Sequence, residues 1–157
     1  PDAMAAVAGS DCALCLMHMR GEPGTMQNAP AYSDVVREVR AFLVARVAAV
    51  RAVGIDDCRL VLDLGFGFGK SLQHNLVLFR ALTAAGVDDL PMLVGVSRKS
   101  MLGAITGRPV EQRLAASIAA ATLAALKGAK ILRVHDVAET SDALAVLAAI
   151  EEGVGNE

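Results

Sequence analysis

The sequence repeats one local pattern four times: a short apolar run, a cluster of glycine or polar residues, and then a helical pattern. Continuous apolar runs bounded by turn residues are typical of strands buried on both faces, as in parallel sheets covered by helices. The predicted strands are residues 13–17, 59–62, 92–96 and 131–132. The sequence therefore predicts an α/β fold in which strands and helices alternate.

The helical patterns show apolar or alanine-rich stretches between stop signals. We expect helices over residues 35–53, 72–85, 111–127 and 142–150, with Ser33-Asp34, Ser71 and either Thr140 or Ser141 as N-caps. In doubly wound sheets and (β/α) barrels, the loops that lead from strand to helix carry the chemistry. The polar clusters therefore predict one functional rim.

Composition excludes several classes of protein. A chain of 157 residues, 54% apolar and 20% charged, permits one domain with a substantial core. The net charge of -2 and the absence of a basic run argue against bulk nucleic-acid binding. No apolar stretch approaches the ~18 residues of a membrane span. We expect a cytoplasmic protein with no membrane or nucleic-acid partner.

The cysteines, Cys12, Cys15 and Cys58, are odd in number and follow no secretory leader, which fits a reducing compartment. Cys12 and Cys15 have C-x-x-C spacing, but residues three apart on a strand point to opposite faces and no second pair supplies ligands. We interpret all three as small apolar fillers.

Glycine alternates with other residues directly after the second predicted strand, at Gly65, Gly67 and Gly69. The run misses the P-loop, which needs glycine at position 64, and the dinucleotide motif, which needs glycine at position 70. It is either a phosphate loop or a tight connection that uses glycine for positive φ. Asp63, at the strand end, either binds a ligand N–H group or caps this loop.

Two further clusters end strands. Residues 97–100 read Ser-Arg-Lys-Ser, which favours binding of an anion or a carbonyl over a solvated loop. Arg133 and His135 point to the same side by the period of two, which suits a phosphate group, unless the arginine faces a helix and the histidine lies in the core. His18 and Arg20 repeat that spacing.

For His18 and Arg20 the alternative is that Met17 and Met19 pack while the polar pair reaches solvent. His74-Asn75 fits simple capping or surface polarity in the first turn of a helix. No Ser/His/Asp or Cys/His nucleophile set and no zinc-ligand spacing is evident in the sequence. The clustered groups therefore predict binding and polarisation of a substrate rather than attack on it.

Four spaced motifs resemble the C-terminal half of the dihydropteroate synthase family, the folate-pathway enzymes that sulfonamides target. In chain order they are residues 16–21 with Pro23 and residues 25–27 (Thr25 to Gln27), the glycine loop with His74-Asn75, residues 95–100, and residues 133–137. The resemblance implies a TIM-like (β/α)8 barrel in which residues 1–157 form strands five to eight and their helices. The N-terminal half of the barrel domain would be absent, so we expect a fragment.

The same resemblance implies a transferase that joins 6-hydroxymethyl-7,8-dihydropterin pyrophosphate to p-aminobenzoate, is inhibited by sulfonamides, and forms a homodimer. Catalysis would be dissociative, with magnesium and protein cations stabilising the departing pyrophosphate. The asparagine that contacts magnesium in the family belongs to the absent half. The implied catalytic residues are Lys99, Arg133 and His135.

The implied substrate contacts follow residue by residue. Asp63 would bond the amidine-like nitrogens of the pterin, and Lys99 would reach its carbonyl side. Arg133 would lie over the pterin ring and, with His135, hold the pyrophosphate. The substrate-binding set is completed by Phe68 and Ser100, near the p-aminobenzoate pocket.

The chain departs from the family pattern at Leu64, where proline is usual, and at Phe66, where an aliphatic residue is common. A half barrel exposes strand edges and an apolar interior, so we expect residues 1–157 alone to be weakly active or inactive. Two other interpretations stay open: an inactive structural or dimerisation unit, and a pterin-binding methyltransferase domain.

Overall fold

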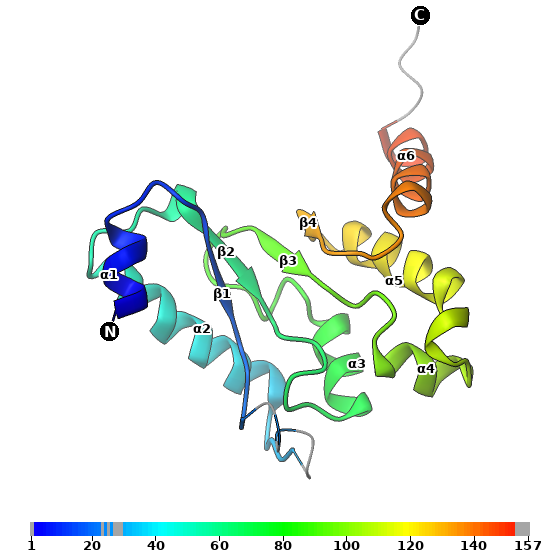
Figure 1. The fold of residues 1–157 in the computed structure, drawn as a ribbon, viewed down its shortest axis with the longest axis horizontal. Helices are drawn as coiled ribbons and strands as arrows, with labels where there is room; N and C mark the ends of the chain where they lie inside the picture. Colours follow the sequence, from blue (N-terminus) through cyan, green and yellow to red (C-terminus); the bar gives the residue numbers. More distant parts are fainter. Residues whose placement is uncertain (1, 23, 25, 27–29, 153–157) are drawn as a thin grey trace, which may run out of the picture.

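The computed structural model describes residues 2–22, 24, 26 and 30–152, and its centre is a parallel sheet of four strands (Figure 1). The strands are β1 (Leu14–Met17), β2 (Leu60–Asp63), β3 (Met92–Val94) and β4 (Ile131–Leu132). Their order in the sheet is β1-β2-β3-β4, so each strand pairs in parallel with the next one along the chain. The α/β prediction and all four predicted strands are confirmed.

Helices precede, connect and follow the strands. They are α1 (Asp2–Ala8), α2 (Val35–Arg51), α3 (Leu72–Arg80), α4 (Ser100–Thr106), α5 (Leu114–Leu126) and α6 (Val137–Glu152). Short 3₁₀ turns cover Asp57–Arg59 and Val110–Gln112. Helices α1 and α4 were not predicted from the sequence.

Two of the predicted helix caps are confirmed. The Asp34 carboxylate accepts from the backbone N–H groups of Val36 and Arg37, and the Ser71 hydroxyl accepts from that of His74. The predicted cap of the last helix is wrong, because α6 begins at Val137. Thr140 lies within its first turn and donates to the carbonyl of Asp136 at 2.7 Å, so its hydroxyl satisfies a backbone acceptor inside the helix.

The register of the strands separates two faces of the sheet. Leu16, Leu62 and Met92 are paired neighbours and are buried against the helices. One residue further along each strand, the side chains point to the other face of the sheet. The paired neighbours there are, in order across the sheet, Met17, Asp63, Leu93 and Ile131. Met17 and Ile131 are 37% and 41% exposed, so the second face is open. The expectation that these strands are buried on both faces is wrong for this chain, because the helices cover one face.

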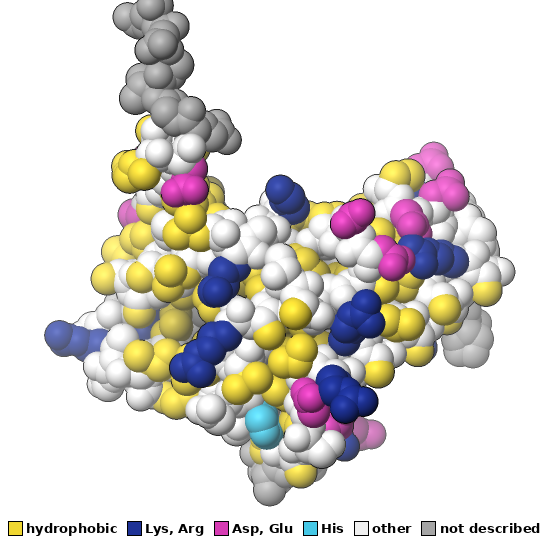
Figure 2. Space-filling view, turned by 180° about the vertical axis from the view of Figure 1, so that it is seen from behind, with side chains coloured by type: hydrophobic (Ala, Val, Ile, Leu, Met, Phe, Trp, Pro, Cys, Tyr) yellow, Lys and Arg dark blue, Asp and Glu magenta, His cyan; other side chains and the backbone are white. Residues whose placement is uncertain are grey.

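The buried face of the sheet packs against apolar side chains that recur with the period of a helix. Helix α2 buries Val35, Val39, Leu43, Val47 and Val50, which recur every three or four residues. This stripe packs in one core with the strand residues and with Phe66 and Leu78. Many apolar side chains still lie on the surface between the charged ones (Figure 2).

The interpretation of the cysteines as buried fillers is wrong, because Cys12, Cys15 and Cys58 are all exposed. Cys15 lies on β1 between Leu14 and Leu16, so the alternation of the strand points it away from the buried Leu16. None of the described helices is both long enough and apolar enough to cross a membrane.

Candidate functional site

The glycine loop, residues 65–69, packs directly on the chain that follows β1. Gly65, Gly67 and Gly69 all have positive φ. A Cβ atom at Gly65 would lie 1.8 Å from the carbonyl oxygen of His18, and one at Gly69 would lie 2.1 Å from that of Arg20. Neither position can hold a side chain. The glycines therefore make the tight connection that the sequence offered as one of two interpretations.

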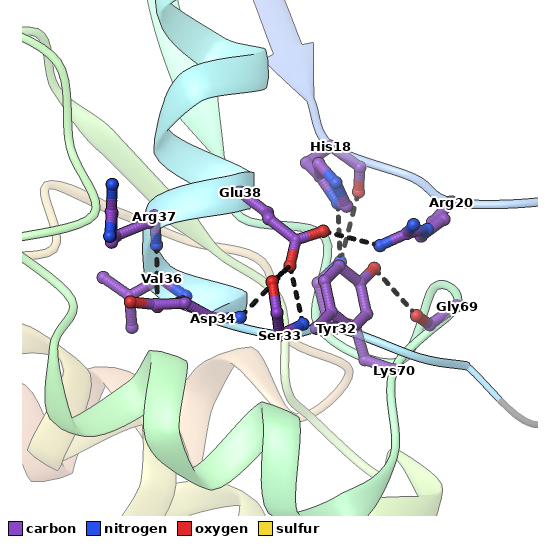
Figure 3. A network of polar contacts seen from close by, with 10 residues as sticks. All are labelled: His18, Arg20, Tyr32, Ser33, Asp34, Val36, Arg37, Glu38, Gly69 and Lys70. Atoms are coloured by element: carbon purple, nitrogen blue, oxygen red, sulfur yellow. Dashed lines mark hydrogen bonds and ion pairs between the residues drawn. The ribbon is translucent and has the colours of Figure 1, made fainter.

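Lys70 stabilises this loop through hydrogen bonds from its buried side chain, a role that was not predicted from the sequence. Its side chain is buried, and Nζ donates to the carbonyls of Gly65 at 2.9 Å and Phe68 at 3.1 Å. Nζ also lies 2.9 Å from Nδ1 of His18 (Figure 3). Burial lowers the pKa of Lys70 to about 7, against the opposing effect of the Asp63 carboxylate. The sequence marked position 70 only as a departure from the dinucleotide motif.

His18 is a buried structural residue. Burial, reinforced by the Lys70 ammonium, lowers the pKa of His18 to about 4. Its ring meets Phe42 edge-on at 5.0 Å between centroids. The sequence alternative had Met17 and Met19 packing while the polar pair reached solvent, but both methionines are exposed and His18 is buried.

Arg20 is held at the surface. Its guanidinium forms an ion pair of 2.8 Å with Glu38 and lies 4.7 Å from the ring centroid of Tyr32. The Tyr32 hydroxyl in turn donates to the carbonyl of Gly69 at 2.9 Å (Figure 3). His18 and Arg20 therefore join the first strand end to the glycine loop instead of forming a separate anion site.

Asp63 occupies the carboxyl end of β2 on the open face of the sheet. Its Oδ1 accepts from the N–H of Gly65 at 2.7 Å, which is the loop cap that the sequence allowed. Burial raises the pKa of Asp63, while that hydrogen bond and the Lys99 charge oppose the rise. Within the described part of the chain, Oδ2 has no hydrogen-bond partner. One carboxylate oxygen thus caps the loop and the other remains available to a ligand.

Lys99 reaches across to the glycine loop. Its Nζ donates to the carbonyl of Phe66 and lies 4.8 Å from the ring centroid of Phe68. Burial lowers the pKa of Lys99, and the Asp63 carboxylate opposes this. The predicted residues Asp63, Phe68 and Lys99 are therefore brought together. Ser100 is exposed and begins α4, directly after Lys99.

Arg133 and His135 line one cavity of about 310 Å³, as the period of two predicted. Both residues are exposed, which contradicts the alternative of a core histidine. The cavity is formed by Gly95, Ser97, Arg98, Lys99, Val110, Arg133 and His135. Two neighbouring strand ends thus present a lysine, an arginine and a histidine to a single space.

Arg98 has a structural contact that its place in the Ser-Arg-Lys-Ser cluster did not reveal. Its guanidinium forms two hydrogen bonds to the Asp136 carboxylate, which also make an ion pair. Its backbone N–H donates to the Ser117 hydroxyl at 2.9 Å, and its φ is +55°. Arg98 therefore ties the loop after β3 to the loop after β4.

Residues 1–135 match the sequence model of a family described as pterin binding enzyme. The chain belongs to this family. It is 49% identical over 146 residues to the dihydropteroate synthase of Haemophilus influenzae, a match that covers 93% of this chain and 53% of that protein. It is 46% identical over 149 residues to the dihydropteroate synthase of Escherichia coli, covering 95% and 53%. The chain thus spans about half the length of these curated relatives.

Solved structures give the same family assignment. A Yersinia pestis dihydropteroate synthase in a sulfonamide drug complex superposes with a TM-score of 0.93 at 42% identity, over 98% of this chain and 56% of that one. A Burkholderia cenocepacia dihydropteroate synthase complexed with 7,8-dihydropteroate superposes with a TM-score of 0.90 at 49% identity, over 97% and 57%.

The described residues of the family motifs have structural roles that differ from one residue to the next. The Ser71 side chain accepts from the backbone N–H of His74, and the His74 side chain accepts from the backbone N–H of Ser71. The predicted capping role of His74 is therefore confirmed. Asn75 is buried, and its side-chain oxygen accepts from the N–H of Gly67 at 2.9 Å. The departures Leu64 and Phe66 are both fully buried in the core. Pro23, Thr25 and Gln27, which contributed to the resemblance, lie outside the described residues.

The magnesium that the family resemblance implies finds no ligand set among the residues that the structure describes. Among the described residues, no group of three His, Cys, Asp or Glu side chains is placed to hold a metal ion. Lys99 and Arg133 line the cavity beside neutral groups, and their positive charges repel a divalent cation. No chemical step is therefore assigned to a metal held by this chain.

Proposed function

We propose that this chain is the C-terminal part of the barrel domain of a dihydropteroate synthase, contributing strands five to eight. The observation that carries the proposal is the convergence of Asp63, Lys99 and Arg133, which influence one another electrostatically. Asp63 ends β2, Lys99 lies in the loop after β3, and Arg133 directly follows β4, so they come from three adjacent strands. Identity above 45% to enzymes of that name, over most of this chain, supports it.

The proposed roles follow from the chemistry of each group. The free Oδ2 of Asp63 accepts N–H groups from the edge of the pterin, and the Lys99 ammonium donates to the pterin carbonyl. Phe68, whose ring lies below Lys99, and the exposed Ser100 border the p-aminobenzoate pocket. Ser100 has an O–H group that suits a carboxylate.

Arg133 and His135 hold the pyrophosphate in this proposal, because they share a cavity with Lys99. The bond between the pterin methylene carbon and the pyrophosphate oxygen breaks, and the pyrophosphate leaves with the bonding electrons. The nitrogen of p-aminobenzoate then bonds to that carbon and loses a proton. Fixed cations near the leaving oxygens lower the barrier electrostatically, so the protein needs no nucleophile.

The complete protein would supply a second half of the barrel, magnesium and a partner subunit to this chain. The open sheet face, with Met17 and Ile131, would be covered by the N-terminal half of the barrel. Magnesium would accompany the pyrophosphate, sulfonamides would compete with p-aminobenzoate, and the location would be the cytoplasm. A homodimer would cover the apolar groove of about 300 Å³ where Leu76, Ile105 and Leu123 lie.

The test is dihydropteroate formation from the two substrates, using the complete protein that the gene encodes. Arg133→Ala and Lys99→Met should each lower kcat by about 100-fold or more, the usual effect of removing a group that stabilises developing charge. Lys130→Met is the matched control, because Lys130 is exposed and precedes β4 at the opposite end of the sheet. No product, or equal turnover in all variants, would overturn the proposal.

A further inference from the structure

We infer that Ser97 is a positioning residue that fixes the tautomer of His135, so that the imidazole presents its Nε2–H group to the anionic end of the substrate. Ser97 follows β3 and is only 5% exposed. Its hydroxyl oxygen accepts from the backbone N–H of His135 at 3.2 Å and lies 3.0 Å from Nδ1 of the same residue. One buried hydroxyl thus meets both the backbone and the ring of His135.

The hydrogen bonds of Ser97 decide which ring nitrogen carries the proton. A hydroxyl has one hydrogen to donate, and its oxygen already accepts the backbone N–H of His135. Nδ1 is the one acceptor that the described residues offer to the Ser97 hydrogen. If Nδ1 carried the proton instead, the O–H group of Ser97, a residue only 5% exposed, would have no acceptor among the described residues, which is costly. The neutral ring is therefore protonated at Nε2.

A neighbouring contact joins the same two loops. Arg98, next to Ser97, binds the carboxylate of Asp136, next to His135. The loops after β3 and β4 are consequently joined at two successive residue pairs. A flip of the ring about the Cβ–Cγ bond, which would exchange Nδ1 with Cδ2, would break the Ser97 contact.

The consequence for binding depends on the function proposed above. Nδ1 is turned to Ser97 while the exposed ring lines the cavity of Arg133 and Lys99, so Nε2 is the ring nitrogen left to a ligand. An Nε2–H group donates to a pyrophosphate oxygen, whereas the other tautomer would present a lone pair and repel it. Ser97 thereby gives the His135 ring an Nε2–H donor beside Lys99 and Arg133 in the neutral form of the imidazole as well as in the protonated form.

The first test reads the tautomer directly. Long-range ¹H–¹⁵N NMR spectra of the full chain, at a pH where imidazole is neutral, distinguish a protonated from an unprotonated ring nitrogen. We expect His135 to be a single Nε2–H tautomer, and Ser97→Ala to give a mixture or the Nδ1–H form. Ser141→Ala, which changes an exposed serine of α6, should match the unmodified chain. An Nδ1–H ring in the unmodified chain, or an unchanged ring in Ser97→Ala, would overturn the inference.

The second test uses inorganic pyrophosphate as the probe, titrated into the complete protein. Ser97→Ala should raise the Kd about tenfold, the cost typical of a lost hydrogen bond to a charged group. In a His135→Gln background, where the amide N–H donor has no tautomer, adding Ser97→Ala should change the Kd less than twofold. An equal loss in both backgrounds would overturn the positioning role.

The two proposals fail in different ways. A fixed Nε2–H tautomer together with no pyrophosphate binding in any variant would support the role of Ser97 and contradict the proposed function. Pyrophosphate binding that is indifferent to Ser97→Ala would contradict the role of Ser97 and leave the proposed function standing.

Discussion

Nζ of Lys70 lies 2.9 Å from Nδ1 of His18, and both side chains are at most 5% exposed. The two residues belong to different β/α units, His18 following β1 and Lys70 closing the glycine loop after β2. The same ammonium group also binds two carbonyls of that loop. The glycine loop that follows Asp63 and contains Phe68 is therefore held by hydrogen bonds from inside the protein.

Lys70→Met should destabilise the chain. The substitution keeps the length of the side chain but leaves the carbonyls of Gly65 and Phe68 without their buried donor. Each unsatisfied buried group costs about 1–3 kcal/mol, so we expect a loss of roughly 2–4 kcal/mol in urea unfolding. Lys130→Met, which changes an exposed lysine, is the control. Equal unfolding midpoints for the two variants would contradict this role of Lys70.

The free energy of unfolding should decrease as the pH is lowered, because the unfolded state protonates His18 more readily than the folded state does. The folded-state pKa of about 4 lies below the unfolded value of about 6.5, so the unfolded state takes up the proton first as the pH falls. The contribution is complete above pH ~6.5 and declines towards pH ~4, by roughly 2–3 kcal/mol. In His18→Gln, whose amide oxygen still accepts from Lys70, the decline in this window should shrink. An identical pH profile would show that another group is responsible.

Two glycine substitutions separate backbone strain from steric overlap. Gly65 and Gly54 both have positive φ, but a Cβ atom at Gly65 would overlap the carbonyl of His18 while one at Gly54 meets nothing within 4 Å. Gly54→Ala should cost about 1–2 kcal/mol from conformation alone. Gly65→Ala should cost several kcal/mol or prevent folding. Thermal unfolding compares them, and similar Tm values would mean that the loop moves away from β1 at little cost.

Arg98 and Asp136 should behave as a coupled pair. Their side chains are 38% and 12% exposed, which places this ion pair partly out of solvent. We expect Arg98→Met and Asp136→Asn to be non-additive, with a coupling free energy of roughly 1 kcal/mol in a double-mutant cycle. Strict additivity would mean that the two loops are held together by other contacts.

Features that depend on local sequence were predictable. The alternation of strands and helices followed from apolar runs and stop signals, and Asp34 and Ser71 were recognisable as caps because they precede helical patterns directly. The shared side of Arg133 and His135 followed from the period of a strand. These predictions needed no knowledge of distant residues.

Features that depend on partners far along the chain were not predictable. The carbonyl of His18 is a main reason why Gly65 must be glycine, and it lies 47 residues earlier in the sequence. Likewise, Arg98 looked like an anion-binding cation until Asp136 was found beside it. The exposure of Cys15 follows from a sheet face that the helices of this chain leave open. Such contacts are set by the tertiary fold, which a single sequence does not display.

The most direct test of the central claim is calorimetric titration of the complete protein with 6-hydroxymethyl-7,8-dihydropterin pyrophosphate. We expect saturable binding that weakens at least about tenfold in Asp63→Asn, because the amide presents at most one acceptor where the carboxylate offers two. Lys130→Met should bind like the unmodified protein. No binding, or equal binding by Asp63→Asn, would contradict the claim that the strand ends of β2, β3 and β4 form a pterin pyrophosphate site.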